Sequence, residues 1–408
     1  MAKWRYDHHD YQNYIDQPTD TAVMTDLVAN WRHDHSHHHD HVDQQPDPVV
    51  VTDPVVTDPV VTAPVVTDPV VTAPVVTDPV VTDPVVTDPA VPTAPVASPT
   101  PTPVNLTYST APIHSSYDGQ VIENLDLYVA NGDAVTITND NVILRNVRIH
   151  HAEGDGVSVL GASNVTIENA EIINSSPPSG IDPETSENIL NINAEGSPNL
   201  TVHNVTLRDG SSGIYLLESP GANISHVDGY DFHGPMPRGQ FVQFDKSGDS
   251  TLTDFYVLNH AGSSYPEDNV SVYASPNTTI SRGVIDGNNS ESGVAVMFEN
   301  GSTGGRVEYV DAIHQGNGAF SSYDSDVVFD HTRSFDNIYA DQGRGPSLSD
   351  ALIWNVSNTG ISILNSTYTD PGNPGNIVWD ASKAVVVDVH EDPNATPMAH
   401  IVNQYAWS

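Results

Sequence analysis

Histidine, aspartate, asparagine and arginine recur at one point of a repeating sequence pattern, where each predicted strand ends in a turn. The recurring residues are His150, His151, Asn174, Arg208, Asp209, His233, Asn259, His260, Asp286, His314 and Asp336. Imidazoles and carboxylates gathered along one edge of a fold can act as acids, bases or cation ligands toward a sugar chain lying across it. The alternative interpretation is structural, because Asn, Asp and His tolerate turn conformations and cap turns locally.

Three polar segments longer than the ordinary turns adjoin these positions, at residues 175–188, 233–240 and 260–269. Extended loops on one side of a repeat fold often wall a binding groove. The substrate-binding residues predicted for this groove are His150, His151, Asp155, Asp209, Tyr215 and Lys246. The carboxylates among the groove residues also make Ca²⁺ a candidate ligand.

Catalysis in this groove is predicted to involve a histidine and an arginine. His233 or His260 would serve as the base, and Arg208 or Arg238 would neutralise a uronate carboxylate so that its C5 proton can be abstracted. Basic residues are scarce, since the sequence holds 13 Lys and Arg against 53 Asp and Glu. An exposed arginine is, however, more often simply solvated.

A histidine-rich stretch near the N-terminus, HDHSHHHDH, is a second candidate for ligand binding. Its imidazoles belong to His33, His35, His37, His38, His39 and His41. At this density several ligands are within reach of one another, so the stretch can capture Zn²⁺ or Ni²⁺ loosely. The alternative is a solvated, disordered segment, because no hydrophobic residues are present to fix the geometry of a metal site.

Apolar residues repeat in a way that predicts stacked strands. Val142, Val165 and Leu200 each begin a run with apolar residues at offsets of two, five and seven. An offset of two keeps side chains on one strand face, whereas a step of three requires a bend. A coil of bent strands therefore buries its aliphatic side chains against the turns above and below.

Asparagines fall at the bend of each repeat. They are Asn124, Asn146, Asn169 and Asn204, and weaker matches place Asp228, Asp311 and Asn355 in the same column. Stacked amides can hydrogen-bond from one turn of the coil to the next. A structural role is expected for them.

Composition divides the chain into three parts. Residues 1–48 are polar and rich in His, and residues 49–104 contain the repeat TDPVV or TAPVV. Proline at every fifth position excludes helix and sheet ladders, so this second part is predicted to be a semi-rigid spacer, about 150 Å long at about 3.1 Å per residue. Residues 105–408 are predicted to form one all-β domain.

Net charge and cysteine content exclude several classes of function. The formal charge is −40 and there is no cysteine, so disulfides and thiolate chemistry are absent. An acidic surface without a Lys/Arg cluster disfavours binding to nucleic acid or anionic membranes. We expect no membrane span and no cleavable secretory signal, because neither a long apolar run nor an apolar segment after the first charges occurs.

The pattern NVILRNVRI, GDGVSV and NVTIENAEI resembles the pectate-lyase-like superfamily of β-helix proteins over most of residues 105–408. The resemblance implies a right-handed parallel β-helix, the hand that parallel crossovers generally prefer. It does not imply one activity, since the superfamily includes lyases, hydrolases, epimerases, adhesins and phage tailspikes. The Arg-x-Pro-x-x-Arg motif typical of pectate lyases and the Gly-His-Gly of polygalacturonases are both missing.

One loop resembles a more specific family. The segment GIDPE, residues 180–184, is similar to part of the Asp-Pro-His loop of alginate C5-epimerases, which implies a catalytic Asp182. Glu184 stands where that loop has histidine, and no tyrosine precedes Gly180. A short acidic loop of this composition also arises by chance.

Two functions follow from these expectations. The first is an extracellular polysaccharide-acting enzyme, of the uronan lyase, C5-epimerase or glycoside hydrolase type. The second is a non-catalytic module at the cell surface that binds glycan or protein and is displayed on the spacer. The sequence leaves the oligomeric state open.

Overall fold

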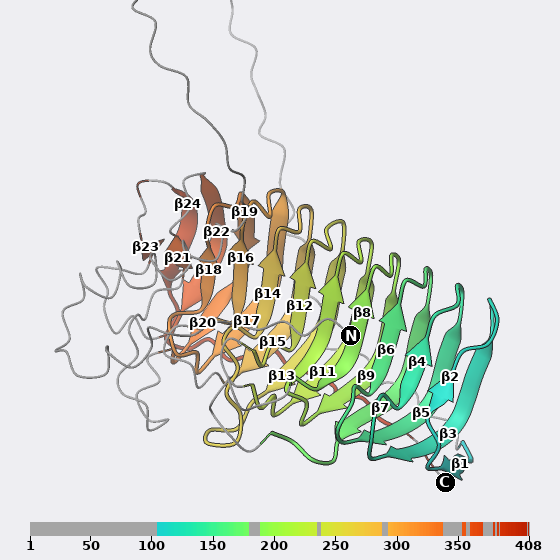
Figure 1. Ribbon diagram of the computed structural model, residues 1–408. Coiled ribbons are helices and arrows are strands. Elements are labelled where there is room, and N and C mark those ends of the chain that lie inside the picture. The colour runs from blue at the N-terminus through green and yellow to red at the C-terminus, as the bar shows by residue number, and fades with distance from the viewer. Residues whose placement is uncertain are drawn as a thin grey trace, which may run out of the picture. The chain divides into compact units, whose positions relative to one another are not determined.

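The structure is a computed structural model in which the described residues are 104–178, 188–234, 238–287, 293–337, 353–355, 360–369, 378–379, 382, 384–405 and 407 (Figure 1). The predicted His-rich segment and its six histidines lie outside the described residues, as do the spacer up to residue 103 and Asp182. No helix among the described residues is long and apolar enough to cross a membrane.

Two parallel sheets make up the described part of the domain. The first holds the longer strands and is called the long-strand sheet. It consists of β1 (Thr107–Ser109), β3 (Val121–Val129), β5 (Ile143–His151), β7 (Thr166–Asn174), β9 (Thr201–Arg208), β11 (Asn223–Tyr230), β13 (Thr251–Leu258), β15 (Thr279–Asp286), β17 (Gly305–Ile313), β19 (Val327–Asp330), β20 (Arg333–Phe335), β22 (Ile361–Tyr368) and β24 (Ala384–Glu391).

The second sheet, called the short-strand sheet, faces the first across the core. It consists of β2 (Ile113–His114), β4 (Val135–Ile137), β6 (Val157–Leu160), β8 (Leu190–Glu195), β10 (Ser212–Leu217), β12 (Val242–Asp245), β14 (Val270–Tyr273), β16 (Val296–Glu299), β18 (Phe320–Ser322), β21 (Ile353–Asn355) and β23 (Val378–Trp379). Up to β17 the chain alternates between the sheets and each strand pairs with the strand two elements later, whereas β18 pairs with β21 and β19 with β22. Figure 1 shows the resulting stack of turns, or rungs.

The predicted apolar stack is confirmed. Val142, Val165 and Leu200 are buried in one continuous core cluster, and the strands that follow them pair in parallel. In the middle rungs the aliphatic residues give way to phenylalanines, among them Phe232, Phe241 and Phe255. Because the rungs pair in parallel and in register, residues at the same position of the repeat form a column. Neighbouring members of a column are about 4.8 Å apart, the distance between adjacent strands.

A column of left-handed residues bends every long strand. Asn124, Asn146, Asn169 and Asn204 have φ between 51° and 59°. The Asn146 side-chain amide donates to Asn124 Oδ1 at 3.2 Å, and that of Asn204 donates to Asn169 Oδ1 at 2.7 Å. Asparagine adopts this conformation at lower cost than most residues, which explains its recurrence at the bend.

The weaker members predicted for this column were wrong. In β11 and β17 the bend is formed by His226 and Tyr309, with φ of 53° in each. Asp228 and Asp311 lie two residues further on, and Asn355 belongs to the other sheet. Inter-rung pairing forces even His and Tyr into the left-handed region here, so residue type alone does not locate the bend.

Residues 392–405 and 407 form a strap across the outer face of the long-strand sheet. His400 Nε2 lies 2.7 Å from Asp228 Oδ1, and the Asn403 backbone N–H donates to Asp228 Oδ2. Tyr405 donates its hydroxyl to the Ala170 carbonyl at 2.9 Å. Trp407 pairs with Val104 in an isolated bridge, so this end of the strap lies close to the start of β1 (Figure 1).

Replacing Gly283 by alanine is expected to destabilise the core. A Cβ at Gly283 would collide with the Phe255 ring, which lies in register on the neighbouring strand. Overpacking of this kind costs about 1–3 kcal/mol, seen as a lower free energy of unfolding in denaturant titrations. Shortening the ring in Phe255→Leu/Gly283→Ala should recover part of the loss, whereas simply additive effects of the two changes would argue against this packing.

Candidate functional site

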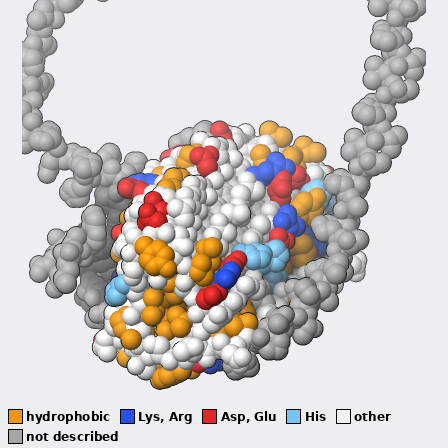
Figure 2. Space-filling view, turned by 90° about the vertical axis from the view of Figure 1, so that its right-hand side faces the viewer, with side chains coloured by type: hydrophobic (Ala, Val, Ile, Leu, Met, Phe, Trp, Pro, Cys, Tyr) orange, Lys and Arg blue, Asp and Glu red, His pale blue; other side chains and the backbone are white. Residues whose placement is uncertain are grey.

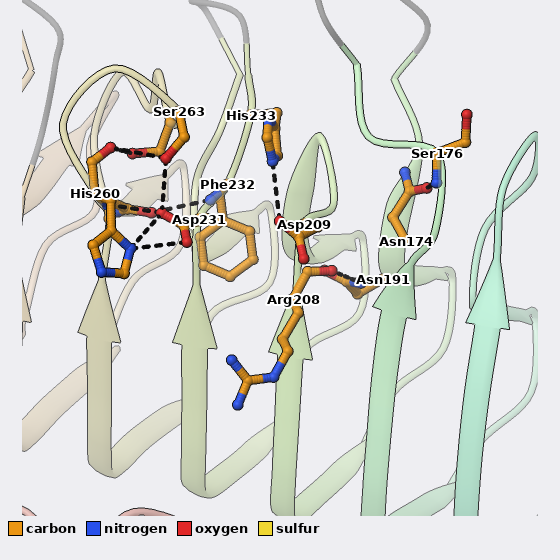
Figure 3. Close-up of polar contacts among 12 residues, drawn as sticks. Asn174, Ser176, Asn191, Arg208, Asp209, Asp231, Phe232, His233, His260 and Ser263 are labelled. Carbon is orange, nitrogen blue, oxygen red and sulfur yellow. Dashed lines mark hydrogen bonds and ion pairs between the residues drawn. The ribbon is translucent and has the colours of Figure 1, made fainter.

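The carboxyl ends of the long strands form an edge where polar side chains gather, and we call it the polar edge. Arg208 ends β9, Asp231 follows β11 and His260 follows β13. Figure 3 shows these residues at the ends of consecutive strands. The sequence prediction that such side chains share one edge is therefore confirmed in its geometry.

The first pair on the polar edge is Asp209 with His233. His233 Nε2 lies 3.2 Å from Asp209 Oδ1, and the His233 side chain is only 14% exposed. The His233 backbone N–H donates to the Gly210 carbonyl, which fixes the imidazole one rung above the carboxylate. Asp209 itself has a φ of 57°, so its side chain leaves the strand at a sharp turn.

The second pair, Asp231 with His260, repeats this arrangement one rung further. His260 Nδ1 lies 2.9 Å from Asp231 Oδ2, and the His260 backbone N–H donates to Asp231 Oδ1 at 2.8 Å. The Ser263 hydroxyl donates to the same oxygen at 3.3 Å. Asp231 has a φ of 52°, the same conformation as Asp209.

Asp209 and Asp231 occupy equivalent positions on adjacent rungs. The Asp209 backbone N–H donates to the Tyr230 carbonyl, and that of Asp231 donates to the Leu258 carbonyl. Neighbouring strands are about 4.8 Å apart, so the two carboxylates leave the backbone about that far from each other. The polar edge thus presents two carboxylates side by side, each in contact with an imidazole.

A third carboxylate and imidazole pair lies further along the edge. His314 Nδ1 is 2.7 Å from Asp286 Oδ1, and His314 Nε2 is 3.6 Å from Asp336 Oδ2. The hydrogen bond with Asp286 raises the pKa of His314, against the opposing effect of burial. The pairing of acid and imidazole is therefore a repeated property of this edge.

Buried amides support the polar edge from below. The side-chain oxygen Oδ1 of Asn259 accepts a hydrogen bond from the Phe232 N–H, and the Asn259 side-chain amide donates to Asn269 Oδ1 at 2.7 Å. Asn269 in turn donates to Gln315 Oε1 at 3.0 Å. This chain of buried amides joins several rungs and holds the turns that carry Asp231 and His260.

Asn174 contributes a donor at the other side of the edge. Asn174 is buried. Its Oδ1 accepts a hydrogen bond from the Ser176 N–H at 2.8 Å, while its Nδ2 has no hydrogen-bond partner. Figure 3 shows the amide at the strand end next to the one that carries Arg208 and Asp209. An unpaired buried N–H donor next to the pair of carboxylates is suited to a hydroxyl ligand.

Arg208 extends away from the two carboxylate and imidazole pairs (Figure 3). Its guanidinium carbon lies 4.1 Å from the centre of the Tyr230 ring, and its Nε lies 3.5 Å from Glu171 Oε1. The arginine predicted to neutralise a uronate is thus held on the outer face of the sheet by a cation–π contact and an ion pair. Arg238 lies in the turn before β12, where its carbonyl accepts from the Glu267 N–H.

The other predicted binding residues do not converge on the polar edge. Tyr215 is on β10 of the short-strand sheet, where its hydroxyl donates to Asp245 Oδ2 at 3.1 Å. Lys246 follows β12 and lies 3.5 Å from Glu218. His150 is the last outward-facing residue of β5, stacked on Tyr128 at 4.1 Å between ring centres.

His151 is a buried structural residue. Its Nδ1 contacts the Gly154 carbonyl at 2.8 Å, and its Nε2 lies 3.2 Å from the Asn191 amide. That amide also donates to the carbonyls of Ile172 and Arg208. Burial lowers the pKa of His151 to about 4, so the ring is neutral at physiological pH.

Asp155 lies in the turn between β5 and β6, beside the carboxylate of Asp133. The Leu190 N–H donates to Asp155 Oδ1 at 2.8 Å, and the Ser158 hydroxyl lies 2.8 Å from Asp133 Oδ2 and 3.5 Å from Asp155 Oδ2. Burial, reinforced by the charge of Asp133, raises the pKa of Asp155 to about 7 despite the hydrogen bond from Leu190.

Sequence reasoning missed Asp231, Ser263 and the supporting amides of Asn269 and Gln315. Asp231 was detectable, because it stands one residue after Tyr230 as Asp209 stands one after Arg208. Ser263 and Asn269 lie in a loop without a repeat, so only the tertiary structure reveals their contacts. No group of three or more His, Asp or Glu suited to a metal ion occurs within the described residues. The calcium, zinc and nickel sites remain predictions.

Residues 105–248 match the protein family described as the right handed beta helix region. The domain is a right-handed parallel β-helix. The fold implied by the resemblance to the pectate-lyase-like superfamily is therefore confirmed. No curated protein matches the sequence.

Several solved structures are similar to this chain at low sequence identity. They include the catalytic domain of a GH87 alpha-1,3-glucanase in complex with nigerose, at 11% identity and a TM-score of 0.40, over 75% of this chain and 64% of that one. An endo-xylogalacturonan hydrolase from Aspergillus tubingensis matches at 11% identity and a TM-score of 0.36, over 75% and 92% of the two chains. An alginate lyase matches at 14% and 0.40, over 76% and 88%.

This chain spans less than two thirds of the glucanase catalytic domains, with coverage of 63% or 64% of their length. Likeness at these identities concerns the fold alone. The activity of this protein must be argued from its own residues.

Replacing Asp155 by asparagine is expected to change how stability depends on pH. With a folded pKa of about 7 and an unfolded value of about 3.9, wild-type Asp155 contributes stability below pH 4 that is lost as the pH rises through 7. The Asp155→Asn variant lacks this loss. Its free energy of unfolding, relative to wild type, should therefore rise between pH 4 and pH 7 and then level off.

His151 acts in the opposite direction, because its lowered pKa removes stability as the pH falls from about 6.5 to 4. The comparison of variant with wild type cancels this contribution, since both proteins keep His151. A difference between the two proteins that is constant over this range would contradict the raised pKa of Asp155.

Proposed function

We propose that this β-helix is a polysaccharide-cleaving enzyme of the glycoside hydrolase type, with Asp209 and Asp231 as its catalytic residues. The observation that supports the proposal is the side-by-side placement of these carboxylates on adjacent rungs, each in contact with an imidazole. Hydrolysis of a glycosidic bond needs two carboxyl groups, and retaining enzymes hold them about 5 Å apart. One rung of a parallel sheet supplies about that spacing.

The contacts of the two carboxylates suggest separate roles. Asp231 is held by the His260 N–H, the His260 ring and Ser263, and this fixed position suits a nucleophile that attacks the anomeric carbon. Asp209 is 38% exposed and contacts the His233 ring, and this more accessible position suits the acid that protonates the leaving oxygen. Water then cleaves the glycosyl–enzyme bond, with Asp209 taking the proton of that water.

The position of Arg208 supports hydrolysis over elimination or epimerisation. Both of those reactions remove the C5 proton of a uronate, whose carboxylate must be neutralised by a cation. Arg208 is engaged by Glu171 and Tyr230 and points away from both imidazoles. Polysaccharides of the size that spans several rungs occur outside cells, so we place the protein outside the cell or at the cell surface.

The substitutions Asp209→Asn and Asp231→Asn are expected to lower the rate of polysaccharide cleavage at least about 100-fold, as is typical for loss of a general acid or a nucleophile. The measurement is the release of reducing ends from a panel of neutral and uronic polysaccharides. Asp388→Asn is a matched control, because Asp388 also contacts an imidazole, His390, at 3.1 Å, but lies on β24.

Products that carry an unsaturated sugar at the new non-reducing end would contradict a hydrolase and indicate a lyase. Full activity in both Asp209→Asn and Asp231→Asn would show that these two carboxylates do not take part in catalysis. Binding of a polysaccharide by the wild-type protein without any product would instead identify a non-catalytic glycan-binding module.

A further inference from the structure

Two histidines lie side by side where consecutive long strands bend. His203 is on β9 and His226 is on β11, the next strand of the long-strand sheet. The centres of the two imidazole rings are 5.0 Å apart, and the ring planes meet at 66°. Both residues are exposed. The pair therefore presents ring nitrogens to solvent from two adjacent rungs, several residues before the polar edge.

Exposure alone does not single out these two histidines. Figure 2 looks onto the first rungs of the β-helix and shows histidine side chains (pale blue) at more than one place on the surface. His114, on β2, is also exposed, and the exposed ring of His260 lies against the carboxylate of Asp231. What distinguishes His203 and His226 is that each has a second imidazole as its neighbour.

The backbone holds His226 in a conformation that most residues avoid. Its φ is 53°, which is the left-handed bend that Asn204 forms on the neighbouring strand. The residues on either side of His226 pair in register with β9 and β13, so the bend is fixed. The Asn403 side-chain amide of the strap also donates to the His226 carbonyl at 2.9 Å. A ligand of the pair therefore needs to order only the two rings, which lowers the entropic cost of binding.

A hydroxyl group beside the pair orients one of the rings. His203 Nδ1 lies 3.0 Å from the hydroxyl oxygen of Ser225, which is on the neighbouring strand. When Nδ1–H donates to this oxygen, the lone pair of the ring is on Nε2. Histidines that bind metals commonly use their second ring nitrogen in this way, because the hydrogen bond fixes both the tautomer and the ring orientation. His203 thus has the support that a metal-binding imidazole needs.

The spacing of the two rings matches that of imidazoles around one cation. Zn²⁺ binds an imidazole nitrogen at about 2.0–2.1 Å, so the metal lies about 3.2 Å from the centre of the ring. Two rings at the tetrahedral angle then have centres about 5.2 Å apart. The separation of His203 and His226 is 5.0 Å. Closing the pair around a cation therefore needs rotation of the side chains but no movement of the strands.

The charges around the pair favour a cation. Glu168 pairs in register with His203 on the preceding rung, so both side chains leave the same face of the sheet. Asp254 forms the bend of β13, next to His226, and accepts hydrogen bonds from Arg282 at 2.7 and 2.8 Å. Arg282 balances the charge of Asp254, whereas Glu168 adds a negative charge beside the pair. This charge attracts a cation toward the two imidazoles.

We propose that His203 and His226 chelate a divalent transition-metal cation of the Zn²⁺ type, through one nitrogen of each ring and with water in the remaining positions. Imidazole suits Zn²⁺, Ni²⁺ and Cu²⁺, whereas Ca²⁺ and Mg²⁺ prefer oxygen ligands. The cation links two rungs and, through Asn403, the strap. The site lies apart from Asp209 and Asp231 and does not depend on the proposed hydrolase activity.

The test is thermal unfolding of the full chain with and without ZnCl₂. A cation that binds only the folded pair raises the unfolding midpoint, by about 5 °C when Zn²⁺ is at about 100 times its dissociation constant. The variants His203→Thr and His226→Asn should each lose this shift. Both replacements suit the backbone, because asparagine forms the bend on neighbouring strands and Thr253 occupies the position of His203 two rungs further on.

His114→Thr is the matched control. It removes one exposed imidazole and introduces the residue type of its register partner, Thr136. This variant should keep the full shift. The histidine-rich stretch at residues 33–41 is the same in all variants, so any metal that it binds cancels in the comparison. CaCl₂ in place of ZnCl₂ should give no shift that depends on His203 or His226.

A second measurement uses only the wild-type protein and therefore does not depend on the folding of a variant. Diethyl pyrocarbonate acylates neutral imidazoles, and mass spectrometry of the peptides locates the acylated residues. Zn²⁺ should lower the acylation of His203 and His226 together, while His114 should stay reactive.

Four results would overturn the inference. They are the absence of a Zn²⁺-dependent shift in the wild type, an equal shift in the wild type and in His226→Asn, an equal loss of the shift in His114→Thr, and unchanged acylation of His203 and His226 in the presence of Zn²⁺. Protection of only one of the two rings would likewise reject chelation, because it would indicate a cation bound to a single imidazole.

Discussion

Burial of each rung by its neighbours is the constraint on which the rest of this structure depends. A single rung exposes its aliphatic side chains above and below, and only a parallel rung in register can cover both the side chains and the backbone hydrogen-bonding groups. The continuous core from Ile122 to Ile363 shows that this condition is met through the described rungs. Phe255 over Gly283 shows how closely the rungs depend on each other, because one fills the space that the other leaves.

Register inside the β-helix determines the chemistry outside it. Once the inward residues are aligned, every outward position becomes a column with a spacing of about 4.8 Å. The pairs of Asp209 with His233 and of Asp231 with His260 follow from this repetition.

The strap adds a constraint that repetition does not supply. Its residues have no counterpart in the rungs, yet His400 and Asn403 satisfy the buried carboxylate of Asp228. A buried charge without such partners is costly, so the strap and the column beneath it stabilise each other.

The sequence alone determined the β-helix fold and the common edge of its polar residues. Period-two alternation with a step of three is a local property, and the asparagines at the bend recur because few other residues adopt a left-handed conformation at low cost. The position of Val142, Val165 and Leu200 in one core followed from that pattern.

Only the tertiary structure decided which polar residues face one another. His151 and Arg208 share the edge with Asp209 in the sequence pattern. In the structure the His151 ring is buried, and the Arg208 guanidinium lies over the Tyr230 ring. The contacts of Ser263, Asn269 and the strap join segments that have no repeat. Side-chain direction and long-range contacts depend on packing across rungs, and a periodic pattern holds no information about them.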